Sequence, residues 1–283
     1  MSKQLASTAR EDRILNRQPP FSIAWRRAKG ASAGAIAVAC HASRTPPEQA
    51  LEGAIRICEI CDERFGGNAR GNLFPLLKNE MESRMPHDAH EIVNSRKGTV
   101  ALAHRELFPR NRPVLATEFE TREDLIEGVC DSSTFPFFFT NFPARVRRKR
   151  GETFPSIICD GYFNVPRERL GCPDFDQLSL DDGSANKAPI VERTITVACF
   201  PHDTIGLTCS EEHNKISPAA DMNDKAGQLT RLFKYATQPS PRKELEALYE
   251  QGWQDAEIWH RKEEARERKF LDRMRKDGSL DLN

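Results

Sequence analysis

Ser32 stands in the pentapeptide Gly30-Ala31-Ser32-Ala33-Gly34, which has the Gly-x-Ser-x-Gly pattern. In this pattern a sharp turn from a strand into a helix exposes the serine hydroxyl, and the glycines remove side chains that would block substrate or neighbouring strands. The start of the helix also offers backbone N–H groups to developing negative charge. The pattern predicts a nucleophilic serine, although five small residues can also make a plain tight turn.

Two pairs of potential ligands have spacings that metal sites use. Cys58 and Cys61 have the spacing of a zinc or redox pair, but they fall inside an expected amphipathic helix, and no second cysteine pair lies at zinc-finger distance. His87 and His90 are more simply explained by a turn. We therefore expect no metal site and no cofactor.

The segments that must position Ser32 alternate between helix and strand patterns. Small residues over 35–40 favour a closely packed helix directly after the serine turn. Thr45-Pro46-Pro47-Glu48 has the spacing of a capping box and opens a helix expected to end at Gly66-Gly67. The other expected elements are helices around 73–81 and 121–130 and strands at 99–103, 114–119, 156–159 and 194–199. This alternation implies an α/β domain with a mostly parallel sheet.

The chain of 283 residues has room for one α/β domain of roughly 200 to 250 residues and an appendage. We expect a flexible leader over 1–20, the α/β domain over 21–240, with a solvated loop at 176–190, and a charged C-terminal helix over 241–283. The apolar stripe of that helix is formed by Leu245, Leu248, Tyr249 and Trp253.

Composition narrows the partners and the compartment. Lys plus Arg and Asp plus Glu both number 42, so no net field attracts nucleic acid. The chain has eight cysteines but no signal-peptide pattern, which favours a reducing, cytoplasmic location. No stretch approaches the ~18 to 20 apolar residues of a membrane-spanning helix. Contact with a membrane or lipid droplet is therefore expected to be peripheral.

A phenylalanine-rich segment over 135–142 precedes a basic run. The five cations of this run are Arg145, Arg147, Arg148, Lys149 and Arg150. Together the rings and cations could dock on an anionic lipid surface, where each basic residue contributes about 1 kcal/mol. The alternative is that the phenylalanines pack in the core and the basic run forms a solvated hairpin.

The segment 30–39 resembles the nucleophile elbow of patatin-like phospholipases, and later landmarks follow in that family's order. These are the helix and serine-rich segment 125–137 and the Cys159-Asp160-Gly161 motif. The similarity spans about residues 28–259. Four features resemble the adiponutrin-like branch in particular: Pro166, the segment 172–175, the strand at 194–199 and the segment 245–259. The resemblance implies a three-layer α/β/α fold with a C-terminal helical extension.

The resemblance also implies a catalytic dyad of Ser32 and Asp160. Asp160 would take the proton of Ser32 directly, Ser32 would attack an ester carbonyl, and water would release the acyl-enzyme. An aspartate with an ordinary pKa near 3.9 is a weak base, so it must lie within hydrogen-bond reach, with its pKa raised by apolar neighbours such as Ile157 and Ile158. The sequence alternative for Asp160-Gly161 is a simple turn.

Two positions depart from the family pattern. Tyr162 replaces a small residue after the Asp-Gly motif, where its ring would narrow the pocket or cover Asp160. No segment before Gly30 resembles the family's glycine-rich oxyanion loop, so we expect an N-terminally truncated patatin-like domain. Loss of one oxyanion donor can cost roughly 10² to 10³ in kcat.

These observations favour a lipid acyl hydrolase that cleaves glycerolipid esters such as triacylglycerol or phospholipid. Two alternatives stay open. One is a catalytically impaired patatin-like protein that binds lipid surfaces or a partner. The other is an α/β-hydrolase esterase with a triad of Ser32, Asp160 and His202. The sequence leaves the oligomeric state open.

Overall fold

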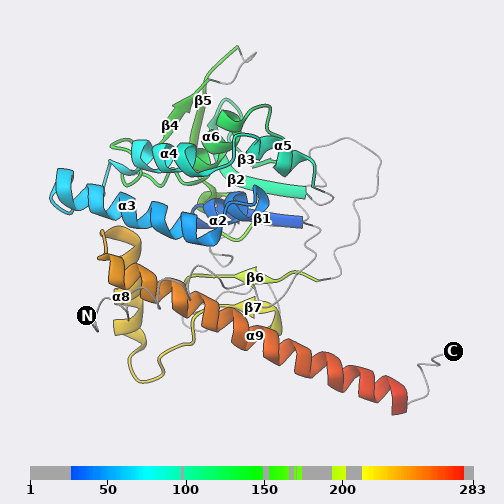
Figure 1. Ribbon diagram of the computed structural model, residues 1–283. Coiled ribbons are helices and arrows are strands. Elements are labelled where there is room, and N and C mark those ends of the chain that lie inside the picture. The colour runs from blue at the N-terminus through cyan, green and yellow to red at the C-terminus, as the bar shows by residue number, and fades with distance from the viewer. Residues whose placement is uncertain are drawn as a thin grey trace.

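Helices and strands are mixed in the first half of the chain, where one described strand is followed by four helices, two strands and a further helix (Figure 1). The structure is a computed structural model that describes residues 27–96, 99–148, 153–165, 169, 171–173, 193–201 and 212–276. The expected leader over 1–20, the expected loop over 176–190 and His202 lie outside these residues. The α/β fold class is confirmed.

The main sheet is built around one long strand, β2 (Thr99–Phe108). Strand β1 (Arg27–Ala31) runs parallel to β2, whereas β3 (Arg112–Ala116) and β5 (Ser156–Asp160) run antiparallel to it. Strand β4 (Arg145–Arg147) is antiparallel to β5. The prediction of mostly parallel pairing is therefore wrong for the described strands of this sheet. Hairpin-length connections such as 109–111 join neighbouring strands antiparallel, and parallel pairs need longer crossovers.

Strands β1 and β5 meet head to head along the same edge of β2. Leu102 and Ala103 pair with both β1 and β3, and His104 and Arg105 pair with both β5 and β3. A strand has two edges, so β3 occupies one edge and β1 and β5 share the other. Strand β1 ends opposite Ala103 and β5 ends opposite His104. Ser32, which follows β1, and Asp160, which ends β5, are thereby brought near each other.

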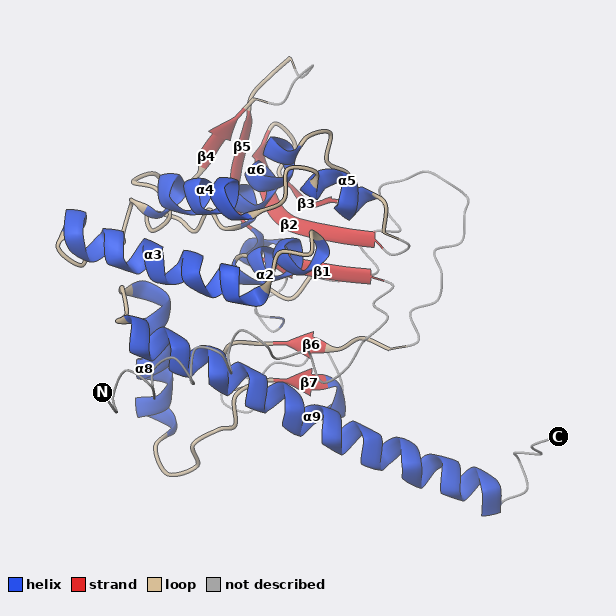
Figure 2. Cartoon of the chain, in the orientation of Figure 1, coloured by secondary structure: helices blue, strands red, loops and turns tan. Residues whose placement is uncertain are grey.

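One hydrophobic core joins β2 to the helices α2 (Ala33–Ala42), α4 (Leu73–Arg84), α5 (Ala89–Asn94) and α6 (Arg122–Ser132) (Figure 2). Its fully buried members include Ala35, Ala39, Ala89, Leu102, Leu125, Ile126 and Val129. The small side chains of α2 let this helix approach the sheet closely, as the composition of 35–40 predicts. These helices form one helical layer, and the second layer of the expected three-layer arrangement stays a prediction.

Helix α3 (Pro47–Phe65) confirms the predicted helix and its end, because Gly66 caps it with a left-handed φ of 59°. The predicted capping box is wrong. Pro46 is the N-cap residue and provides no side-chain hydrogen bond. The Thr45 hydroxyl instead lies 2.9 Å from the Ser43 hydroxyl, where both side chains are buried.

The C-terminal half adds a small parallel sheet and two helices. Asp160 leads into a 3-10 turn, η1 (Gly161–Asn164). Further along, β6 (Thr196–Val197) pairs with β7 (Lys215–Ile216), which follows the turn η4 (Glu212–Asn214). Helix α8 (Lys225–Thr237) precedes the long helix α9 (Arg242–Lys276), which passes beside α3 (Figure 1). Among the described helices, none is both long enough and apolar enough to cross a membrane.

Candidate active site

Ser32 occupies a strained elbow between β1 and α2. Its φ of 53° and ψ of −125° lie in a region of backbone conformation that residues other than glycine rarely adopt. The Ser32 N–H donates to both the carbonyl (3.2 Å) and the hydroxyl (3.1 Å) of Ser132. A Cβ at Gly30 would lie 2.2 Å from the Gly34 carbonyl oxygen, whereas a Cβ at Gly34 would meet nothing within 4 Å. The first glycine of the pentapeptide, but not the second, is therefore required by packing.

Asp160 ends β5 with a fully buried side chain. One carboxylate oxygen, Oδ1, accepts a 2.7 Å hydrogen bond from the Tyr162 N–H. The other, Oδ2, is buried without a hydrogen-bond partner among the described residues. Burial raises the pKa of Asp160 to about 6, against the lowering effects of the Tyr162 N–H and the Ser32 hydroxyl. The Ser32 hydroxyl thus lies close enough to influence the carboxyl, although the two groups do not meet hydrogen-bond geometry.

Gly161 joins the aspartate turn to the serine elbow. A Cβ at Gly161 would lie 2.2 Å from the Ala103 carbonyl oxygen and 3.0 Å from the Cβ of Ala31. Real side chains do not tolerate the first distance, and the clash is with backbone. The Asp-Gly motif therefore packs directly against β2 and the residue before Ser32, and glycine is required there.

A segment at the end of α6 holds both Ser32 and Asp160 in place. Ser132 receives the Ser32 N–H, and its own hydroxyl donates to the Ala103 carbonyl (2.5 Å). The Thr134 carbonyl accepts from the Asp160 N–H (2.9 Å). The serine-rich composition of 132–134 marked this segment in the sequence but gave no role for it, because the role depends on contacts about a hundred and about twenty-five residues away along the chain.

Comparison with known proteins bears on this arrangement. The model of the patatin-like phospholipase family matches residues 16–170, more than half of the chain. The chain belongs to the patatin-like phospholipase family. Searches of curated proteins and of solved structures find no match. The family match includes Ser32, the segment 132–134 and Asp160, and membership in a family that acts on lipid substrates supports lipid acyl hydrolase chemistry in general.

In this patatin-like protein the basic run does not form the expected lipid-facing cluster. Arg145 donates to Asp131 at 2.8 Å and also pairs with Glu127. Arg147 pairs with Asp131 and with Asp124. The Asp131 side chain is completely buried, and both arginines are largely buried.

The expected lipid-surface role of Arg145 and Arg147 is therefore a wrong prediction, because alternate residues of strand β4 point to opposite faces and these two point toward α6. Arg148 is exposed, and Lys149 and Arg150 lie outside the described residues.

The other candidate sites have simpler environments. No cluster of three or more His, Cys, Asp or Glu side chains in the described part of the chain could hold a metal ion. Cys58 and Cys61 lie on α3, and burial raises the pKa of each thiol. His87 precedes α5 and His90 lies within it.

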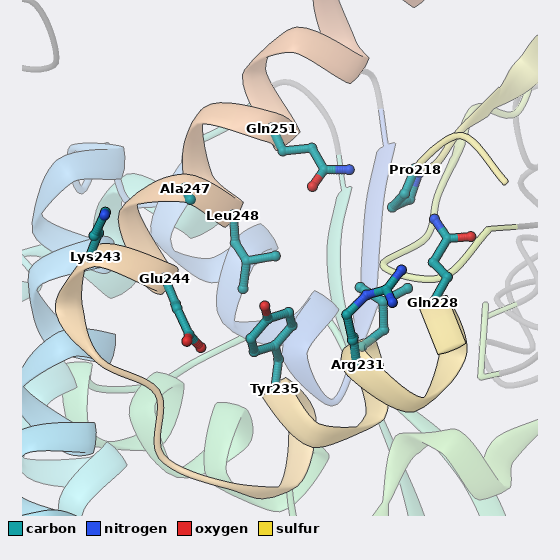
Figure 3. A pocket seen from close by; sticks show the side chains of 10 residues that line it. Pro218, Gln228, Arg231, Tyr235, Lys243, Glu244, Ala247, Leu248 and Gln251 are labelled. Atoms are coloured by element: carbon teal, nitrogen blue, oxygen red, sulfur yellow. The ribbon is translucent and has the colours of Figure 1, made fainter. Parts of the chain in front are cut away.

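A cavity of about 470 Å³ lies between α8 and α9, where Tyr235 and Leu248 point toward each other (Figure 3). Neither Ser32 nor Asp160 lines this cavity.

Proposed function

We propose that this chain is a serine carboxylic-ester hydrolase that cleaves glycerolipid esters with Ser32 as nucleophile and Asp160 as base. The observation that carries the proposal is that Ser32, on a strained turn between β1 and α2, lies near the buried Asp160, whose pKa is raised to about 6. A base works best when its pKa approaches the working pH, so this carboxylate is better suited to accept a proton at neutral pH than an ordinary aspartate.

In the proposed reaction, Asp160 accepts the hydroxyl proton of Ser32 as Oγ bonds to the ester carbonyl carbon. The first backbone N–H groups of a helix have no acceptor in a preceding turn, so those of Ala33 and Gly34 are our candidate oxyanion donors. When the tetrahedral intermediate collapses, the leaving alcohol takes the proton from Asp160. Water then attacks the acyl-enzyme, gives a proton to Asp160, and that proton returns to Ser32 as the fatty acid leaves.

The finer assignments extend the family match. We propose that the chain belongs to the adiponutrin-like branch and acts at the surface of a membrane or lipid droplet. The segment 245–259, one of the features that resemble that branch, lies in α9 and is largely half-buried. No cofactor enters the proposed reaction.

A fluorophosphonate probe and a short-chain nitrophenyl ester test the dyad. We expect the probe to label the chain and the ester to be hydrolysed, with both signals lost in Ser32→Ala and strongly reduced in Asp160→Asn. His202→Ala should leave both signals unchanged, whereas a strong loss would favour the triad. Absence of labelling in the folded chain would favour the alternative of a lipid-binding protein without catalytic activity.

A further inference from the structure

Four exposed phenylalanines gather beside the proposed active site. Phe135, Phe137, Phe142 and Phe163 have exposed fractions of 45%, 49%, 70% and 40%. The rings of Phe135 and Phe163 lie 5.7 Å apart, and the Phe137 N–H donates to the Phe142 carbonyl. We call these four residues the phenylalanine patch. Patches of contiguous apolar surface mark binding sites for proteins, ligands or membranes.

The turn that carries three of these rings is held in a defined conformation. Phe137 has a φ of 58°, which is a strained value for an aromatic residue. The Phe137 carbonyl accepts from the Arg70 side chain (2.9 Å), and the Gly71 N–H donates to the Phe138 carbonyl (2.6 Å). Phe139, by contrast, is buried in the core and anchors the turn. The fold therefore holds the exposed rings outward at a cost in strain and in exposed apolar area.

Tyr162 connects the phenylalanine patch to Asp160, the proposed catalytic base. The Phe135 ring lies 6.4 Å from the Tyr162 ring, and Tyr162 lies 5.4 Å from Phe163. The Tyr162 N–H is the donor to Asp160. A lipid whose acyl chains inserted among these rings would therefore lie next to the proposed site of ester cleavage.

The charges around the patch indicate what kind of surface it fits. Arg145 and Arg147 follow the turn, but they pair with acidic residues of α6. These two side chains therefore present no unpaired charge to a lipid surface. Arg70, whose Nε donates to the Phe137 carbonyl, is an exposed cation beside the turn, and such a cation contributes about 1 kcal/mol at an anionic surface. We propose that the phenylalanine patch docks this protein on the neutral surface of aggregated lipid, held mainly by ring insertion. The proposal rests on the proposed function, because that function supplies the lipid.

Flotation of the full chain with phosphatidylcholine vesicles tests the proposal. Phe142→Ser and the double variant Phe137→Asn with Phe142→Ser should weaken vesicle binding by about tenfold or more, because buried rings supply the attraction. Asparagine is chosen at position 137 because it tolerates a positive φ. The matched controls are Phe233→Ser and Phe270→Ser, whose rings on α8 and α9 are 64% and 61% exposed. These controls should bind vesicles as the unchanged chain does.

Salt and spectroscopy provide independent measurements. Binding should persist at roughly 0.5 M salt, where charge attraction is screened. Phe142→Trp keeps an apolar ring, so it should bind vesicles and show a blue-shifted emission when they are added. The proposal is overturned if patch and control variants bind equally, if only anionic vesicles are bound, or if the added tryptophan shows no shift while the chain floats.

Fluorophosphonate labelling without lipid separates the two proposals. The patch variants should label at the rate of the unchanged chain, because the patch lies outside the dyad. Normal labelling with unchanged vesicle binding in the patch variants would overturn the docking proposal alone. Absent labelling with vesicle binding that depends on the rings would overturn the catalytic proposal alone.

Discussion

The titration of Asp160 determines the expected pH dependence of hydrolysis. The proposed base must be ionised in the free enzyme, and burial raises its pKa to about 6. We expect kcat/KM to fall about tenfold for each pH unit below about 6 and to level off above it. A pH profile with a soluble nitrophenyl ester checks this. A profile that falls only below pH 4, with the chain still folded, would mean that the buried carboxyl is not the base.

The same raised pKa predicts a cost to stability. The folded state binds the Asp160 proton more tightly than the unfolded state, so ionisation destabilises the folded chain as pH rises from about 4 to about 6. At pH 8 we expect Asp160→Asn to raise the free energy of unfolding by about 1 to 3 kcal/mol. The gain should vanish below pH about 4, where both states are protonated in the unchanged chain. Denaturant titrations at the two pH values test the sign.

The two glycines of the serine pentapeptide should differ in their tolerance to substitution. Gly30→Ala places a methyl group 2.2 Å from the Gly34 carbonyl oxygen, so backbone must move. We expect a loss of about 2 kcal/mol or more, as for other overpacked sites. Gly34→Ala meets open space on a helix and should stabilise by about 0.4 to 1 kcal/mol. Thermal unfolding of the two variants compares them directly, and equal melting temperatures would contradict the structure.

At the scale of elements, the ion pairs between β4 and α6 connect the sheet edge to the segment that holds Ser32. Arg145→Ala removes partners of the buried Asp131 and of Glu127, and also the guanidinium that lies 4.3 Å above the Phe74 ring. Leaving a buried charge without one of its partners costs about 3 kcal/mol. Arg148→Ala, on the exposed side chain of the same run, should change stability by less than about 0.5 kcal/mol.

Urea denaturation measures both of these free energies. If Arg145→Ala and Arg148→Ala are equally mild, the ion-pair cluster does not contribute to the fold as its burial indicates. If Arg145→Ala also slows fluorophosphonate labelling while Arg148→Ala does not, the cluster positions Ser132 as well.

At the scale of the whole molecule, side-chain hydrogen bonds fasten α9 to the rest of the chain. Arg242 donates to Glu52 of α3 at 2.7 and 3.0 Å. The buried Trp259 donates its indole N–H to the His213 carbonyl (2.8 Å) and packs beneath Arg193. Trp259→Ala should lower the free energy of unfolding by about 3 kcal/mol. Phe270→Ala, on the exposed end of α9, should change it little.

Circular dichroism during thermal unfolding distinguishes these variants. One cooperative transition that shifts downward in Trp259→Ala would indicate that α9 unfolds with the domain. A separate early transition, with the main one unchanged, would mean that α9 is an independent appendage. The sequence-based division at residue 241 stays a prediction until this is measured.

The sequence determined which residues form the elements and which two could form the dyad. Periodicity, glycine at a helix end and a pentapeptide of small residues are local signals, and α2, α3 and β5 form close to where these signals predict. The direction of β5 and the inward orientation of Arg145 could not be predicted from such local signals. Both depend on which edge of β2 each strand joins, and strand partners far apart in the chain leave no local pattern.

The family resemblance implied that Ser32 and Asp160 lie together, and the tertiary structure decides how they approach each other. We expected a mostly parallel sheet. Instead β1 and β5 approach from opposite directions along the same edge of β2 and stop at neighbouring positions. Residue types together with the family resemblance determined the candidate chemistry. Only the pairing of long-range strands decided the geometry, because register is set by packing that forms when distant segments meet.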